Sequence, residues 1–205
     1  MERDEAIEQL QKLVGKDLVH LAKKYDVTVW KGGKLNKGWA GHVIERYLGL
    51  PLSSAQSPNF GSWELKIVPL KRLRSGEIVP KETMAITMID PVNVAATPFE
   101  RSHLLAKLQK AVVCARMFES KAEKSSVLVS VTAFDLDNPI IFNQVKNDYD
   151  LVREAIRKKG FRRLTGRMGV FAQPRTKGPG HGSTSRAFYA RKEFLRIILR
   201  LKPKA

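Results

Sequence analysis

The chain has 205 residues, of which 43% are hydrophobic and 28% are charged, and it contains a single cysteine, Cys114. This length and composition predict one globular domain, and no apolar run approaches the roughly 20 residues that cross a bilayer. One cysteine excludes an internal disulfide and a cysteine-based zinc site. We therefore expect a cytoplasmic protein, with no secretory signal and no membrane partner.

The formal net charge of +17 is concentrated near the carboxyl end of the chain. Residues 161–205 contain twelve Lys or Arg and one acidic residue, Glu193. A basic segment of this kind gains affinity for nucleic acid because it releases counterions from phosphates. Charge alone does not separate a DNA-binding protein from a ribosome-like RNA binder or from a solvated basic surface.

Hydrophobic spacing and turn residues predict alternating helices and strands. In the first part of the chain we expect a helix over 3–25, a loop over 31–38, a helix from 39 to a stop at Gly49, a turn over 53–62 and a strand over 63–70. Further on we expect a hairpin turn at Ser75-Gly76, its returning strand over 82–90, a helix over 100–118, a β-rich segment over 125–134, a helix over 148–160, a strand and basic loop over 164–178, and a strand followed by a helix over 187–201. Trp39 and Trp63 are predicted to be core anchors.

Glu64 and Lys66 are the charged residues that point to chemistry. Residues two apart on a strand share a face, so these side chains project together while Leu65 and Ile67 point into the core. Phosphodiester hydrolysis requires a carboxylate that holds Mg²⁺ and a lysine that orients or deprotonates a water. Asn59, in the preceding turn, offers an amide oxygen that can bind a hard cation but adds no charge.

By itself, a Glu-x-Lys triplet is more often an ion pair at a strand edge than a nuclease site. Several neighbouring features favour the nuclease interpretation. Pro58, Glu64 and Lys66 occur in order, a turn precedes the strand, Glu45 lies on a preceding helix, and the whole chain is strongly basic.

Five ordered sequence blocks resemble the MutH mismatch-repair nicking endonuclease and its related restriction enzymes, within the PD-(D/E)xK nuclease superfamily. The blocks are Lys37-Gly38-Trp39-Ala40-Gly41 with Glu45 and Leu48-Gly49; Asn59-Phe60 with Glu64-Leu65-Lys66; Ser102-His103 with Lys107-Leu108; Gln173, Arg175 and Lys177; and Phe188-Tyr189 with Lys192. No single block is specific, but the five in this order are.

The resemblance implies a PD-(D/E)xK restriction-endonuclease-like α/β fold, with a mixed central sheet flanked by helices. It implies a single MutH-like domain over 1–205, with a catalytic lobe over 1–120 and a basic DNA-binding lobe over 121–205. The catalytic residues implied are Glu45, Asn59, Glu64, Lys66 and Lys107, of which Asn59, Glu64 and Glu45 would bind the metal. The metal implied is Mg²⁺, with Mn²⁺ as the alternative.

The DNA contacts implied are Lys37, Arg175, Lys177, Tyr189 and Lys192. An arginine can offer two parallel donors to guanine O6 and N7, whereas a lysine is equally suited to a phosphate. For Tyr189 two roles stay open, packing in the protein core and a contact in a DNA groove.

Asn59 stands where the family has Asp, and the gap from Asn59 to Glu64 is shorter than in the family pattern. The loss of one negative charge is expected to weaken metal binding and to impair cleavage. The chain is then either a deliberately inactivated Asp-to-Asn variant, which we favour, or a natural protein that binds DNA without efficient cutting.

We predict a sequence-specific, Mg²⁺-dependent endonuclease that hydrolyses phosphodiester bonds in duplex DNA. A type II restriction enzyme is preferred because a strongly basic protein grips DNA unaided. The alternatives are a MutH-type mismatch-repair nickase, which would need repair partner proteins, and a non-catalytic DNA- or RNA-binding protein on the same scaffold. A homodimer on DNA is one arrangement left open, and a structural RNA-associated protein ranks last because it leaves the five blocks unexplained.

Overall fold

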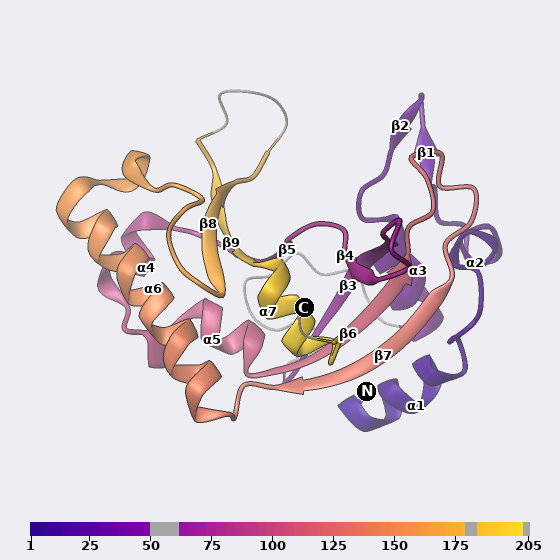
Figure 1. The fold of residues 1–205 in the computed structure, drawn as a ribbon, viewed down its shortest axis with the longest axis horizontal. Coiled ribbons are helices and arrows are strands. Elements are labelled where there is room, and N and C mark those ends of the chain that lie inside the picture. Colours follow the sequence, from indigo (N-terminus) through magenta and orange to yellow (C-terminus); the bar gives the residue numbers. More distant parts are fainter. Residues whose placement is uncertain (50–61, 179–183, 203–205) are drawn as a thin grey trace. The chain divides into compact units, whose positions relative to one another are not determined.

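The computed structural model describes residues 1–49, 62–178 and 184–202. It divides into two compact units whose segments alternate along the chain (Figure 1). Unit 1 comprises Met1–Ala55, Leu65–Glu82 and Val112–Ala133, and unit 2 comprises Gln56–Glu64, Thr83–Ala111 and Phe134–Ala205. Within the described residues, no helix is long and apolar enough to cross a membrane.

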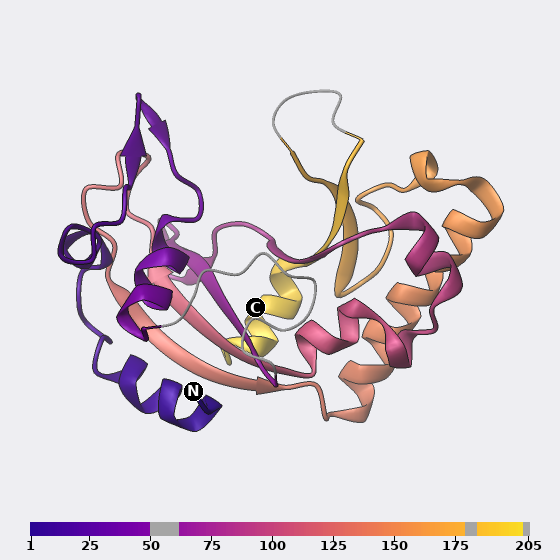
Figure 2. The ribbon, with the colours of Figure 1, turned by 180° about the vertical axis from the view of Figure 1, so that it is seen from behind.

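Unit 1 is built around a four-stranded sheet with the strand order β4-β3-β6-β7. Its strands are β3 Glu64–Arg72, β4 Ile78–Pro80, β6 Lys110–Met117 and β7 Leu128–Asp135. β3 and β4 pair antiparallel, with Leu70 opposite Pro80. Figure 2 shows the neighbours β6 and β7 from behind as two long curved strands. The predicted α/β class, with a mixed sheet flanked by helices, is confirmed.

Among the described residues, unit 1 contains the helices α1 Arg3–Gln11, α2 Leu18–Lys24 and α3 Trp39–Tyr47. The prediction of one helix over 3–25 is wrong, because the chain leaves the helix before Gly15, whose φ is 84°. There the Gly15 N–H donates to the Leu128 carbonyl, and the Leu128 N–H donates to the Lys16 carbonyl. Pairing with β7 therefore replaces the hydrogen bonds of a continuous helix.

Residues 31–38, predicted as a loop, include a tight hairpin. β1 Trp30–Lys31 pairs antiparallel with β2 Lys34–Leu35. Gly32 and Gly33 connect the strands with φ values of 54° and 71°. Positive φ at both central positions is the requirement of a type I′ turn, which glycine meets without strain.

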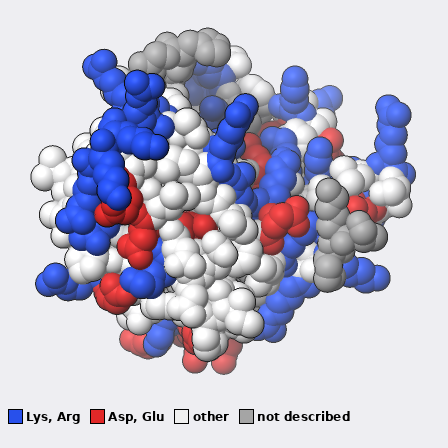
Figure 3. Space-filling view, turned by 60° about the vertical axis from the view of Figure 1, so that its left-hand side comes forward, with Lys and Arg blue, Asp and Glu red and all other residues white. Residues whose placement is uncertain are grey.

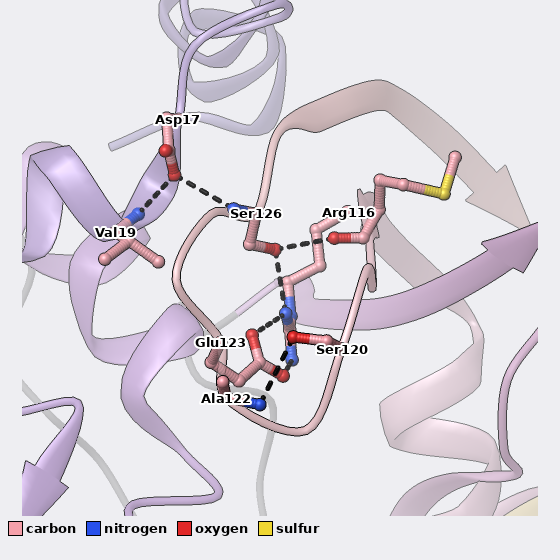
Figure 4. A network of polar contacts seen from close by, with 8 residues as sticks. Asp17, Val19, Arg116, Ser120, Ala122, Glu123 and Ser126 are labelled. Atoms are coloured by element: carbon pink, nitrogen blue, oxygen red, sulfur yellow. Dashed lines mark hydrogen bonds and ion pairs between the residues drawn. The ribbon is translucent and has the colours of Figure 1, made fainter.

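A buried polar network joins the β6–β7 connection to α2 (Figure 4). The Arg116 guanidinium donates to Glu123 Oε2 at 2.7 Å, to Glu123 Oε1 at 3.1 Å and to Ser126 Oγ at 2.8 Å. Asp17 Oδ1 accepts from the N–H groups of Ser126 at 3.0 Å and Val19 at 2.8 Å. Burial opposes ionisation of Asp17, but these N–H groups outweigh it and lower its pKa.

Unit 2 combines a three-stranded antiparallel sheet with most of the helices of the carboxyl-terminal half. The sheet order is β5-β9-β8, with β5 Met84–Met88, β8 Ala172–Thr176 and β9 Arg186–Ala190. The helical segments are α4 Pro91–Ala96, η1 Phe99–Arg101, α5 His103–Leu108, α6 Pro139–Lys159, η2 Phe161–Arg163 and α7 Lys192–Ile198. As predicted, a helix ends at Gly160, which has a φ of 81°.

Aromatic side chains form the core of unit 2. Tyr149 of α6 stacks on Phe188 of β9 with ring centroids 5.7 Å apart, and it also contacts Phe99 at 5.7 Å. Phe194 of α7 stacks on Phe171 at 5.0 Å. The predicted core anchors Trp39, in unit 1, and Trp63, in unit 2, are buried.

Two predicted elements in the middle of the chain are wrong. The helix expected over 100–118 is only α5, and the residues after it form β6. Residues 111–115 are buried without interruption, and a continuous apolar run suits an interior strand as well as a helix. The returning strand expected over 82–90 is replaced by β4, while β5 pairs with β9 in the other sheet.

Cys114 lies in β6 and is completely buried. Burial raises the pKa of its thiol to about 12, so the thiol should stay protonated even at roughly pH 8.5, where an exposed cysteine is half ionised. We expect a thiol-specific disulfide reagent to leave the native protein unmodified and to modify one thiol in guanidinium. Because the folded pKa is raised, the thiol's contribution to stability is complete below the unfolded pKa and is lost as pH rises towards 12. Rapid native labelling would contradict this placement.

Candidate active site

A buried ion pair stands at the beginning of β3. Lys107 Nζ lies 3.2 Å from both Glu64 Oε1 and Glu64 Oε2. Glu64 is 0% exposed and Lys107 is 6% exposed. A carboxylate that has lost its hydration requires a nearby cation, and here the ammonium supplies it. Glu64 therefore occupies an interior position, not the exposed strand edge at which a Glu-x-Lys ion pair is most often found.

The sequence places Lys107 on a short, well-defined helix. Ser102 caps α5, since its Oγ accepts from the Leu105 N–H at 3.1 Å. Leu104 and Leu108 are buried and fix the inward face of the helix. Lys107 lies between these positions on the helical period, so its stem is buried and its ammonium reaches Glu64.

Lys66 follows Glu64 by two positions on β3, which gives both side chains the same face of the strand. Lys66 is partly buried and Leu65 is buried. Ile67, predicted to point into the core, is only partly buried. The shared face of Glu64 and Lys66 thus follows from the strand alone.

Glu45 lies in α3 and is partly buried, as the prediction of a helical acid required. Glu45 and Lys66 belong to unit 1, whereas Glu64 and Lys107 belong to unit 2. Asn59 lies outside the described residues. The structure therefore joins Glu64 to Lys107, and a site that includes the other three stays a prediction.

The donor atoms at this position suit a hard divalent cation. Carboxylate and amide oxygens are the ligands that Mg²⁺ and Mn²⁺ prefer. The Glu64 carboxylate already accommodates one cation, the Lys107 ammonium. Within residues 1–49, 62–178 and 184–202 there is no group of three or more His, Cys, Asp or Glu placed to hold a metal. Glu64 therefore fits as one ligand of a set that would need further oxygens.

The predicted DNA-contacting residues lie on several elements. Arg175 and Lys177 are exposed at the end of β8 and just after it, Lys192 is exposed at the start of α7, and Tyr189 is partly buried on β9. Lys37 is exposed between β2 and α3 in unit 1. Figure 3, with the side of α4 and α6 turned forward, shows many Lys and Arg side chains on that face and fewer Asp and Glu.

Comparison with known proteins points to one family. The family model of the DNA mismatch repair enzyme MutH matches residues 48–147, which include Glu64, Lys66 and Lys107. Over this segment the chain is MutH-like, as its ordered sequence blocks indicate. Three relatives, each named DNA mismatch repair protein MutH, illustrate the likeness along the chain.

The relative from Vibrio campbellii is 26% identical over 218 residues, covering 95% of this chain and 92% of the relative. The relative from Haemophilus influenzae strain PittGG is 24% identical over 219 residues, covering 96% of this chain and 93% of the relative. The relative from Haemophilus ducreyi is 27% identical over 210 residues, covering 91% of this chain and 88% of the relative. The similarity therefore extends well beyond the matched family segment.

Proposed function

We propose that this chain is a divalent-metal-dependent endonuclease of the MutH type that acts on duplex DNA. The observation that carries the proposal is the buried Glu64–Lys107 pair at the start of β3, within the segment matched by the MutH family. Burying a carboxylate and an ammonium costs hydration free energy. A catalytic site offers a reason to retain both charges.

Between the two roles considered, mismatch-repair nicking now has more support than type II restriction. The restriction assignment rested on the net charge, whereas the relatives carry the name of a mismatch repair protein. We propose that the chain cuts one strand of duplex DNA, with repair proteins as partners. A homodimer on DNA and the division into a catalytic lobe over 1–120 and a basic lobe over 121–205 stay predictions.

In the proposed site, Glu64, Glu45 and Asn59 would hold Mg²⁺ or Mn²⁺. When bound, the metal would neutralise charge on the scissile phosphate and increase the acidity of a water. Lys66 would orient that water and accept or share its proton at Nζ. Lys107 fixes the position of the Glu64 carboxylate, while Lys37, Arg175, Lys177, Tyr189 and Lys192 would bind DNA.

The experiment is cleavage of supercoiled plasmid with Mg²⁺, comparing this chain with its Asn59→Asp variant on methylated and unmethylated DNA. We expect Asn59→Asp to produce open circles at least about tenfold faster, because it adds a charged metal ligand. Asn59→Asp/Glu64→Gln is the control and should be inactive. Linear product without open circles would support a restriction enzyme. If neither protein cuts but both retard DNA in a gel, the chain is a non-catalytic binding protein.

A further inference from the structure

The register of the three-stranded sheet places Thr83, Tyr189 and Arg175 on one face. Tyr189 of β9 pairs with Ala85 of β5 and with Gln173 of β8. Paired residues share a face, as do residues two apart on one strand. Thr83 is two positions before Ala85, and Arg175 is two positions after Gln173. Tyr189 therefore lies between Thr83 and Arg175.

The Arg175 side chain is held by both of these neighbours. Its Nη1 donates to Thr83 Oγ1 at 2.8 Å, and its guanidinium carbon lies 5.7 Å from the centre of the Tyr189 ring. Within the part of the chain that the structure describes, no carboxylate forms an ion pair with Arg175. The hydroxyl uses one of the five N–H donors of a guanidinium and leaves its positive charge uncompensated.

The backbone that leads into β8 is also fixed, by a buried carboxylate. Asp148 of α6 is 2% exposed and accepts from the N–H groups of Val170 at 2.8 Å, Phe171 at 2.6 Å and Ala172 at 2.7 Å. The Gln144 side chain donates to the same carboxylate at 2.9 Å. Three successive N–H groups are thus anchored immediately before Gln173 and Arg175.

An arginine fixes the carbonyl groups of the same segment. Arg191 donates to the carbonyl oxygens of Gly169 at 3.0 Å, Gly166 at 2.8 Å and Met168 at 3.1 Å. Gly169 has a φ of 75°, and a Cβ there would overlap the Ala172 carbonyl oxygen. The tight turn therefore requires glycine. We call Asp148, Arg191 and the 166–172 backbone that they bind the clamp.

We propose that Thr83 is a positioning residue that preorganises Arg175 to read a base edge with two acceptors, and that the clamp fixes the backbone from which Arg175 projects. The inference rests on the proposed function, in which this chain binds duplex DNA. A guanidinium held in advance loses less rotational freedom when it forms two parallel bonds. Guanine, with O6 and N7 in the major groove, is the base that offers this pair of acceptors.

The test first identifies a preferred sequence by selecting bound duplexes from a randomised pool, without divalent metal. Dissociation constants are then measured by fluorescence anisotropy for the enriched duplex and for a scrambled duplex of equal length. Thr83→Val removes the hydroxyl and keeps the shape, and we expect it to weaken binding of the enriched duplex about 3- to 10-fold. Binding of the scrambled duplex should change less than about twofold, since phosphate contacts are retained. Thr83→Ser should restore wild-type binding.

A double-mutant cycle separates positioning from general stabilisation. In the Arg175→Ala background, Thr83→Val should have no further effect, because it acts only through the guanidinium. An equal effect with and without Arg175, or none in the wild type, overturns the proposal. Asp148→Asn should selectively weaken binding of the enriched duplex and speed hydrogen exchange at residues 170–172. Unchanged exchange at these residues would show that the clamp does not fix this backbone, and would overturn that part of the proposal. A wild type that binds no duplex contradicts the proposed function itself, whereas one that binds without enriching a sequence overturns only this inference.

Discussion

Replacing Lys107 with methionine is expected to lower the free energy of unfolding by about 3–5 kcal/mol. Glu64 is completely buried, and both of its carboxylate oxygens lie 3.2 Å from Lys107 Nζ. Methionine keeps much of the side-chain volume and removes the charge, so the loss reports the electrostatic contribution. Denaturant titration followed by circular dichroism measures it.

The double variant Lys107→Met/Glu64→Gln should recover part of that stability, because no buried charge remains without a cation. If Lys107→Met and the double variant lose the same free energy of unfolding, then the cause is lost packing and not the unpaired charge. Together with the single variant Glu64→Gln, these variants form a double-mutant cycle that isolates the interaction between the two side chains.

Metal binding gives an independent readout of the same site. If Glu64 is a metal ligand, Mg²⁺ should raise the melting temperature of Lys107→Met more than that of the wild type, since no ammonium then competes for the carboxylate. At a concentration about 100 times Kd, a bound ion adds roughly 2.7 kcal/mol. A Lys107→Met protein that does not respond to Mg²⁺ or Mn²⁺ would contradict the assignment of Glu64 as a ligand.

Replacing Arg116 with methionine is expected to cost a similar amount, about 3–5 kcal/mol, in unit 1. Its guanidinium forms two hydrogen bonds with Glu123 and one with Ser126, and it lies 5.1 Å from the centre of the Trp39 ring. Removing it leaves the Glu123 carboxylate buried without this cation. Hydrogen exchange should increase first in the β6–β7 connection and at the start of α2.

Lys146→Met is the matched control for this prediction. Lys146 pairs with Glu100 at 2.7 Å and with Asp150 at 3.4 Å, but these side chains are substantially exposed. Water screens such pairs, so the loss expected for Lys146→Met is much smaller than that for Arg116→Met. A loss for Arg116→Met as small as that for Lys146→Met would show that burial does not strengthen the Arg116–Glu123 pair.

Local sequence determined the features that depend on neighbouring residues. Ser102 and Gly160 mark the start of α5 and the end of α6, because a capping oxygen and a residue with positive φ act within one turn. The shared face of Glu64 and Lys66 follows from the two-residue period of a strand. The ordered blocks of the MutH-like pattern likewise required no knowledge of the fold.

The tertiary structure decided which of these elements meet. Apolar residues 111–115 suit a helix or an interior strand, and their place in the sheet between β3 and β7 selects the strand. Lys107 reaches Glu64 across 43 positions, and Arg175 reaches Thr83 across 92. Asp148 was predicted only as part of a helix, because a carboxylate that binds backbone N–H groups 22 to 24 positions away leaves no periodic signal. Periodicity reports which face of an element is buried, whereas the partner of that face depends on how distant segments pack.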